Sequence, residues 1–323
     1  MKRSIRALVA ALAALVLALA VAACGDDDES DGGGGSSESG GKLIKRNSAN
    51  ASKSISVGSK NFTEQFILGE IYAQALEAAG YKVKKQLNLG SEVVAFKSLK
   101  QGEVDSYPEY TGTALTSFYK VKVTDVPKDA NQAYTEVKGK LKEDKITALP
   151  QAPFDNTYRL GMTKAKNKEI GSPKTISELK GKSQDLVVNG FPECRQRPDC
   201  LLGVEKTYGL KFKKFLANES KYEVLDRGQA DVAFIFTTDA NLATGKYAIL
   251  DDDKKLFPPY HISFMVKNDV LSKLGPDAKK VVTQVQSGLT EKVMRELNSR
   301  VDLDKKTPKA VASEYLKETG LVK

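Results

Sequence analysis

The sequence predicts an α/β protein made of two similar units. Its 323 residues leave room for about two domains of roughly 100–200 residues each. Short apolar strands alternate with amphipathic helices from residue 55 to residue 107, and the same alternation begins again near residue 157. This order favours largely parallel sheets with helices on both faces. Two such units place a ligand cleft between them.

The elements of the first unit follow from apolar spacing and from helix signals. A strand begins at Ile55 and ends at residues 58–60. Asn61 is expected to cap the next helix in a capping box with Glu64, and Gly80 is expected to end that helix. The remaining elements are predicted as strands at 81–87 and 104–107 with a helix at 91–101 between them, strands at 157–162, 186–188 and 231–236, and helices at 175–180, 222–227, 278–297 and 308–319.

Residues 1–23 have the pattern of a lipoprotein signal peptide. Basic residues precede an apolar run that ends in small residues directly before Cys24. Cleavage there and lipidation of the Cys24 thiol would anchor the chain outside the cytoplasm. An uncleaved membrane span is the alternative, although about 17 apolar residues are at the short limit for one.

Residues 24–53 are predicted to be a flexible tether between this lipid and a domain that begins near Ser54. The segment is rich in Asp, Gly and Ser and has few apolar residues to offset the entropy of ordering. No later apolar run is long enough to span a bilayer, so the N-terminal lipid is the expected membrane attachment.

Composition argues against enzymes, metal sites and nucleic-acid binding. His261 is the only histidine, which excludes a multi-His metal cluster, and phosphate-loop, nucleophile-elbow and zinc-protease motifs are absent. The acidic run 251–253 could hold a cation, but like charges in a turn are usually solvated. The net charge of +9 comes from lysines scattered among acids rather than clustered with aromatics. We therefore expect no enzymatic activity, cofactor, metal or nucleic-acid partner.

Four aromatic residues stand in loops or at strand ends, outside any apolar helical stripe. A quaternary ammonium cannot donate hydrogen bonds, so ring faces are its natural partners. These residues are therefore candidates for a cage around such a cation, although each ring could instead simply pack beneath a loop. They are Tyr110, Tyr158, Phe236 and Tyr260.

A set of motifs over residues 54–323 resembles one protein family. In order, they are G-S-K-N-F-T-E-Q at 58–65, Y-P-E-Y-T-G-T at 107–113, R-P-D at 197–199, T-T-D at 237–239, D-D-K at 252–254, P-P-Y at 258–260 and L-K-E-T-G-L-V-K at 316–323. They resemble the extracellular substrate-binding proteins of ABC importers for glycine betaine, choline and carnitine.

The resemblance implies a two-lobed, venus-flytrap fold of the periplasmic-binding-protein type II class, with two crossover strands. Lobe 1 would comprise residues 54–155 and 259–323, and lobe 2 residues 156–258. A lipid-anchored, monomeric receptor of this kind delivers its solute to a membrane permease driven by a separate ATPase. A sensor for another protein, or a receptor for choline, carnitine or another amine derivative, remains open. An enzyme on this fold would need an acid–base pair that the sequence does not offer.

The family's site residues can be placed on this sequence one by one. The aromatic box falls on the four rings named above, and the groups that hold a ligand carboxylate fall on Lys60, Thr113 and Arg197. Phe236 stands where close relatives have tyrosine. Asn156 stands where some relatives have an acidic residue, which removes a negative charge near the cation. With Lys60 and Arg197 retained, this favours glycine betaine over choline.

Cys194 and Cys200 flank Arg197 in a short segment. In an oxidising compartment these cysteines are expected to form a disulfide. The bond could hold Arg197 in place before the ligand arrives, which lowers the ordering cost of binding, or it could serve stability alone.

Overall fold

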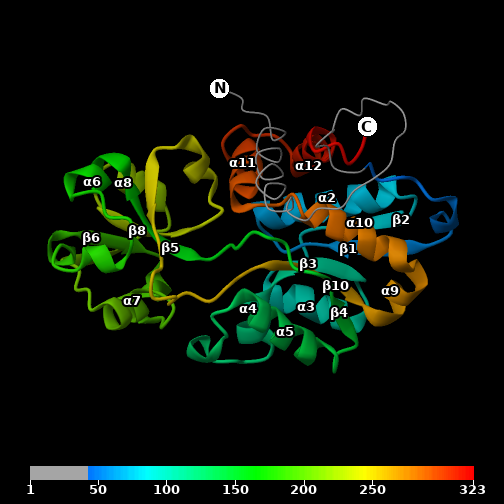
Figure 1. Ribbon diagram of the computed structural model, residues 1–323, viewed down its shortest axis with the longest axis horizontal. Coiled ribbons are helices and arrows are strands. Elements are labelled where there is room, and N and C mark those ends of the chain that lie inside the picture. Colours follow the sequence, from blue (N-terminus) through cyan, green and yellow to red (C-terminus); the bar gives the residue numbers. More distant parts are fainter. Residues whose placement is uncertain (1–42) are drawn as a thin grey trace, which may run out of the picture.

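A computed structural model describes residues 43–323 of the chain. The predicted signal peptide, Cys24 and residues 24–42 of the predicted tether lie outside the described residues. Within residues 43–323, no helix combines the length and apolarity that a membrane span requires. The described chain forms two lobes side by side, each built on a five-stranded sheet flanked by helices (Figure 1). This confirms the α/β, two-lobed prediction.

Lobe 1 contains a sheet in the strand order β2-β1-β3-β10-β4, with helices on both faces. Helix α2 is buried among α10, α11 and α12 on one face, while α3 and α5 cover the other. Its elements are β1 (Ser54–Gly58), α2 (Thr63–Ala78), β2 (Lys82–Gln86), α3 (Glu92–Gln101), β3 (Ser106–Tyr110), α4 (Thr111–Thr113), α5 (Ala130–Leu141), β4 (Ile146–Ala148), β10 (Ile262–Lys267), α9 (Asn268–Leu274), α10 (Pro276–Gln286), α11 (Glu291–Asp302) and α12 (Pro308–Glu318).

Lobe 2 contains the second sheet, in the order β7-β6-β8-β5-β9. Its elements are β5 (Tyr158–Thr163), α6 (Lys164–Glu169), β6 (Val187–Gly190), α7 (Leu201–Tyr208), β7 (Lys214–Ala217), α8 (Lys221–Asp226), β8 (Val232–Phe236), the 3-10 helix η8 (Ala240–Thr244) and β9 (Tyr247–Leu250).

Each sheet is largely parallel, as the sequence predicted, but contains one antiparallel strand. Strands β1, β2 and β3 are parallel, as are β6, β7 and β8, but β10 and β5 run antiparallel to their neighbours. The physical reason is the route of the chain. It enters β5 and β10 from the other lobe, at the edge where β8 and β3 end, so each entering strand must run in the opposite direction.

Residues 149–157 and 251–261 connect the lobes and lie side by side where they cross. Asp155 forms an antiparallel bridge with His261, and its carboxylate accepts a hydrogen bond from the Tyr260 backbone N–H at 2.6 Å. The ring Nδ1 of His261 lies 3.0 Å from the Ala152 carbonyl oxygen. The predicted lobe boundaries at 155/156 and 258/259 fall within these two segments.

The structure corrects the extent of the tether. Residues 43–53, predicted as flexible, pack on lobe 1. Ile44 is buried in the core of the lobe, and the Asn47 backbone N–H and the Asn50 side chain both donate to the Ala79 carbonyl at the end of α2. Apolar Leu43 and Ile44 end the Gly/Ser/Asp-rich composition, so the domain begins about ten residues earlier than Ser54.

Two local predictions were also wrong. Residues 175–180 form only a 3-10 turn at Ser177–Leu179, because the backbone is already extended at Lys180 and enters the left-handed region at Gly181. The predicted helix at 278–297 is divided by a bend at Gly288. A Cβ there would lie 2.7 Å from the Tyr315 hydroxyl, and the close approach of α12 therefore requires glycine.

Candidate functional site

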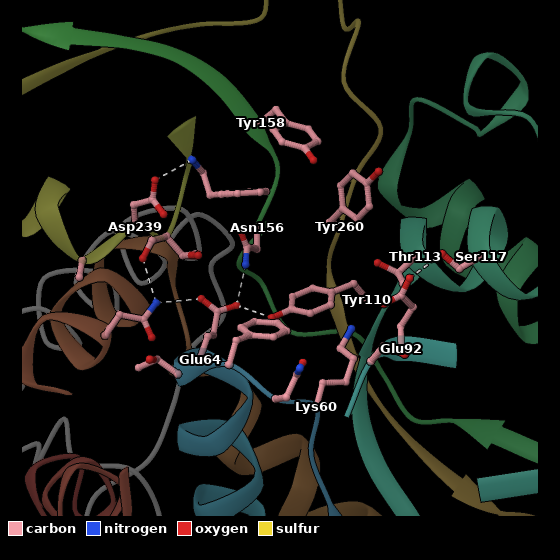
Figure 2. A pocket seen from close by; sticks show the side chains of 18 of the residues that line it. Lys60, Glu64, Glu92, Tyr110, Thr113, Ser117, Asn156, Tyr158, Asp239 and Tyr260 are labelled. Atoms are coloured by element: carbon pink, nitrogen blue, oxygen red, sulfur yellow. Dashed lines mark hydrogen bonds between the residues drawn. The ribbon is translucent and has the colours of Figure 1, made fainter. Parts of the chain in front are cut away.

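A cleft of about 620 Å³ lies between the lobes, and all eight residues proposed from the sequence line it. They come from both lobes and from both crossover segments. Figure 2 shows Tyr110, Tyr158 and Tyr260 around one space, with Lys60 and Glu64 on the lobe 1 side. The eight are Lys60, Tyr110, Thr113, Asn156, Tyr158, Arg197, Phe236 and Tyr260.

The lobe 1 wall is built around Tyr110 at the end of β3. Its hydroxyl donates to the Glu64 carboxylate at 2.7 Å, and its ring stacks on Phe62 at a centroid distance of 6.2 Å. The ammonium of Lys60 lies 4.4 Å from the centre of the Tyr110 ring and pairs with the buried carboxylate of Glu109. Glu109 therefore neutralises the Lys60 ammonium, which the sequence analysis assigned to the ligand carboxylate.

Glu64 is the main site residue that the sequence analysis missed. The expected capping box does not form, because α2 begins at Thr63 without a side-chain cap. Instead, the Glu64 carboxylate accepts hydrogen bonds from Tyr110, from Asn156 at 3.0 Å and from Asn298 at 3.0 Å. Burial raises the pKa of Glu64, and these bonds oppose that rise.

Glu64 also changes the interpretation of Asn156. The sequence analysis took Asn156 as the loss of a negative charge beside the cage. The structure places the Asn156 amide against the Glu64 carboxylate, so an acidic group still lies at that position in the cleft (Figure 2). Glu64 belongs to the G-S-K-N-F-T-E-Q motif at 58–65, and this position in the motif could have identified it as a site residue.

The lobe 2 wall is an aromatic cluster around Tyr158 at the start of β5. Its ring centre lies 4.7 Å from that of Phe236, 5.9 Å from that of Phe257 and 6.2 Å from that of Phe191. Tyr158 and Phe236 are register partners on β5 and β8. Burial raises the pKa of Tyr158 to about 12, so its ring is neutral.

Tyr260 reaches the cleft from the second crossover and rests on Gly112. A Cβ at Gly112 would lie 2.8 Å from the Tyr260 ring and 2.8 Å from the Pro259 carbonyl oxygen. Glycine in the Y-P-E-Y-T-G-T motif therefore allows the crossover to approach α4. Thr113 follows in α4 and lines the same side of the cleft.

Arg197 enters the cleft from a short loop in lobe 2 closed by the Cys194–Cys200 disulfide. Its Nε and Nη2 atoms donate to the buried carboxylate of Asp199 at 2.8 and 2.5 Å. This bidentate pair raises the pKa of Arg197 further. A guanidinium has five N–H donors, so the remaining ones can meet a ligand anion.

The described cleft holds charges and rings rather than reacting groups. Asp239, in the turn between β8 and η8, accepts from the Phe236 backbone N–H at 2.9 Å and pairs with Lys221. Asn298 of α11 also donates to the Thr238 carbonyl at 2.9 Å and so ties lobe 1 to lobe 2. Nothing in the sequence of α11 marked Asn298, whereas Asp239 belongs to the T-T-D motif.

Two α/β lobes joined by paired crossovers, with a ring-lined cleft between them, define a solute-binding protein of the venus-flytrap class. Residues 53–318 match the family model for the substrate binding domain of ABC-type glycine betaine transport systems, and the chain belongs to that family. It is therefore the extracytoplasmic, non-enzymatic binding component of an ABC importer, with a permease partner and a small-molecule ligand.

Several relatives align with most of this chain. A glycine-betaine-binding protein of Pseudomonas aeruginosa is 30% identical over 84% of this chain and 89% of its own length. The carnitine transport binding protein OpuCC of Listeria monocytogenes is 28% identical over 84% and 88%. An ergothioneine transport permease/ergothioneine binding protein of Helicobacter pylori is 29% identical over 86% of this chain, which spans 50% of that longer protein.

Solved structures agree with this fold. One described as a glycine betaine/carnitine/choline ABC transporter has a TM-score of 0.76 at 27% identity, over 82% of this chain and 98% of its own. Apo YehZ of Escherichia coli has a TM-score of 0.72 at 28% identity, over 84% and 99%.

Proposed function

We propose that the protein captures glycine betaine between its lobes and is held at the membrane by a lipid on Cys24. The observation that carries the proposal is the pairing of ring faces with a guanidinium across one cleft. The trimethylammonium would lie among Tyr110, Tyr158, Phe236 and Tyr260, and the carboxylate would meet Arg197 and the Thr113 hydroxyl. The loaded, monomeric receptor would then deliver this solute to the permease.

The magnitudes of these contacts are sufficient for capture. A desolvated cation–π contact contributes about 2 kcal/mol and an exposed one about 0.5–1 kcal/mol. A hydrogen bond to a charged group adds about 1.5–3 kcal/mol. The gross sum exceeds the roughly 8 kcal/mol that corresponds to a dissociation constant of about 1 μM. Lobe closure and desolvation subtract from it, so we expect micromolar affinity.

The ligands named for the relatives support a site with two ends. Glycine betaine, carnitine and ergothioneine all carry a trimethylammonium and a carboxylate, which are the two groups that the cleft can recognise. Because Glu109 neutralises Lys60, we assign the ligand carboxylate to Arg197 and Thr113, and we assign Lys60 to the support of the Tyr110 ring.

Choline is the second candidate, and Glu64 is the observation that favours it. A carboxylate bonded to Tyr110 and Asn156 places negative charge beside the rings, which attracts a cation without a carboxylate of its own. The balance between the two ligands depends on how fully the acidic groups of the cleft are neutralised.

Calorimetric titration of the purified protein with glycine betaine, carnitine, choline and ergothioneine tests the proposal. We expect micromolar glycine betaine binding and weaker choline binding. Choline binding without glycine betaine binding would contradict the assigned ligand, and heat from none of the four would contradict the cage. Loss of incorporated fatty acid in Cys24→Ala would support the lipid anchor, and retention would overturn it.

A further inference from the structure

One cage ring in each lobe has a lysine of the protein itself against one of its faces. In lobe 2, the Lys221 ammonium lies 4.6 Å from the centre of the Phe236 ring and 2.5 Å from the Asp239 carboxylate. Asp239 also accepts from the Tyr222 hydroxyl at 2.8 Å and from the Phe236 backbone N–H. Lysine, ring and carboxylate thus form one unit at the end of β8.

The corresponding unit of lobe 1 is Lys60, Tyr110 and Glu109, but its environment differs. The side chains of Lys60 and Glu109 are 5% and 0% exposed, whereas those of Lys221 and Asp239 are 20% and 18% exposed. Asp239 lines the cleft, and Lys221 is not among the described residues that do. Lys221 therefore offsets, from outside the cleft, a negative charge that faces the ligand.

The electrostatic consequence differs between ligands of different net charge. A cation on one face of a ring weakens the attraction of the other face for a second cation. Removing the Lys221 charge would restore the ring face and leave the Asp239 carboxylate uncompensated. A bare cation would gain from both changes. A zwitterion would be attracted more strongly at its ammonium and repelled more strongly at its carboxylate, so the net change in its binding energy would be small.

We propose that Lys221 is a specificity-determining residue that lowers the affinity of the cleft for bare cations such as choline relative to trimethylammonium carboxylates. The inference rests on the proposed function, because it assumes that Phe236 contacts the ligand cation. Lys221 acts through Phe236 and Asp239 without touching the ligand, and it explains how a cleft that contains Glu64 and Asp239 can still favour glycine betaine.

The test is calorimetric titration of Lys221→Met with choline and with glycine betaine. Methionine keeps the apolar stem against the Phe236 ring and removes the charge. Choline affinity should rise about tenfold, while glycine betaine affinity should change by less than about threefold. Lys221→Gln provides a second neutral variant if methionine lowers the melting temperature. Lys221→Arg should keep the wild-type ratio of the two dissociation constants.

Lys166→Met is the matched control. Lys166 pairs with Asp231 at 3.1 Å in the same lobe and does not line the described cleft, so its loss changes the net charge equally. The ratio of the two dissociation constants should remain that of the wild type. Equal effects of Lys221→Met on both ligands, or the same shift in Lys166→Met, would overturn the inference. Failure of the wild-type protein to bind either compound would instead overturn the proposed function, and the inference with it.

Discussion

The two walls of the cleft differ in how firmly they are built. On the lobe 1 wall, Tyr110 is held by Glu64, and the Lys60–Glu109 pair beneath it is almost fully buried. On the lobe 2 wall, Arg197 is 41% exposed and the Lys221–Asp239 pair is partly solvated. The charged groups of the lobe 1 wall are therefore fixed before a ligand arrives, whereas those of the lobe 2 wall remain partly exposed to solvent.

This difference predicts which substitutions should change the affinity for every ligand and which should change the preference among ligands. Breaking a buried ion pair leaves an uncompensated charge and costs about 3–5 kcal/mol, so the lobe 1 wall tolerates little change. Partly exposed charges cost far less to alter. We expect substitutions of the cage rings in either lobe to weaken all quaternary ammonium ligands together, and substitutions of the partly exposed charges of lobe 2 to alter their rank order.

The largest effect should follow Tyr110→Ala, which removes a ring face and a donor to Glu64. Affinity for glycine betaine and for choline should fall about 100-fold each, since about 2 kcal/mol of cation–π contact is lost along with the positioning of Glu64. Tyr110→Phe keeps the ring and should lose about tenfold or less. Calorimetry on both variants measures this, and a loss confined to one ligand would contradict the role of the Tyr110 ring as a contact for the ammonium of both ligands.

Arg197→Ala should weaken glycine betaine about 30-fold and choline less than about threefold. The charge-assisted bonds that it removes contribute about 1.5–3 kcal/mol and act only on a carboxylate. Arg195→Ala is the matched control, because Arg195 lies in the same disulfide-closed loop with its guanidinium 5.1 Å from the Phe215 ring. Equal losses for both ligands would show that Arg197 supports the loop rather than the anion.

Gly112→Ala should weaken both ligands about tenfold by displacing Tyr260. The added Cβ would lie 2.8 Å from the Tyr260 ring, so the crossover must move. Overpacking of this kind typically costs about 1–3 kcal/mol. Gly139→Ala is the control, because nothing lies within 4 Å of the Cβ position at Gly139. Unchanged affinity in Gly112→Ala would mean that Tyr260 does not contact the ligand.

The smallest effect should appear in Glu64→Gln, as a change in how stability depends on pH. Burial raises the pKa of Glu64 above its ordinary value of 4.5. The folded protein therefore binds this proton more tightly than the unfolded chain, and stability falls as pH rises through the raised pKa. Urea unfolding at a series of pH values should show that the free energy of unfolding of Glu64→Gln rises relative to that of the wild type as pH increases. A difference that is constant with pH would refute this.

The sequence predicted two α/β units and the strands β1, β2, β3, β5, β6 and β8, because apolar alternation is a local signal, but it did not predict β4, β7, β9 or β10. Tyr158 and Phe236 line one cleft, because each stands at a strand end and the two are register partners there. The antiparallel direction of β5 and β10 could not be predicted, because it depends on the route of the chain between lobes. Likewise Glu64, which fits a capping box locally, is held by partners 46, 92 and 234 residues away in the sequence.

A crystal structure of the complex with glycine betaine tests the central claim most directly. The account predicts the trimethylammonium among Tyr110, Tyr158, Phe236 and Tyr260, with the carboxylate on the free donors of Arg197. A carboxylate turned toward Lys60, or a ligand bound with its ammonium away from the rings, would contradict it.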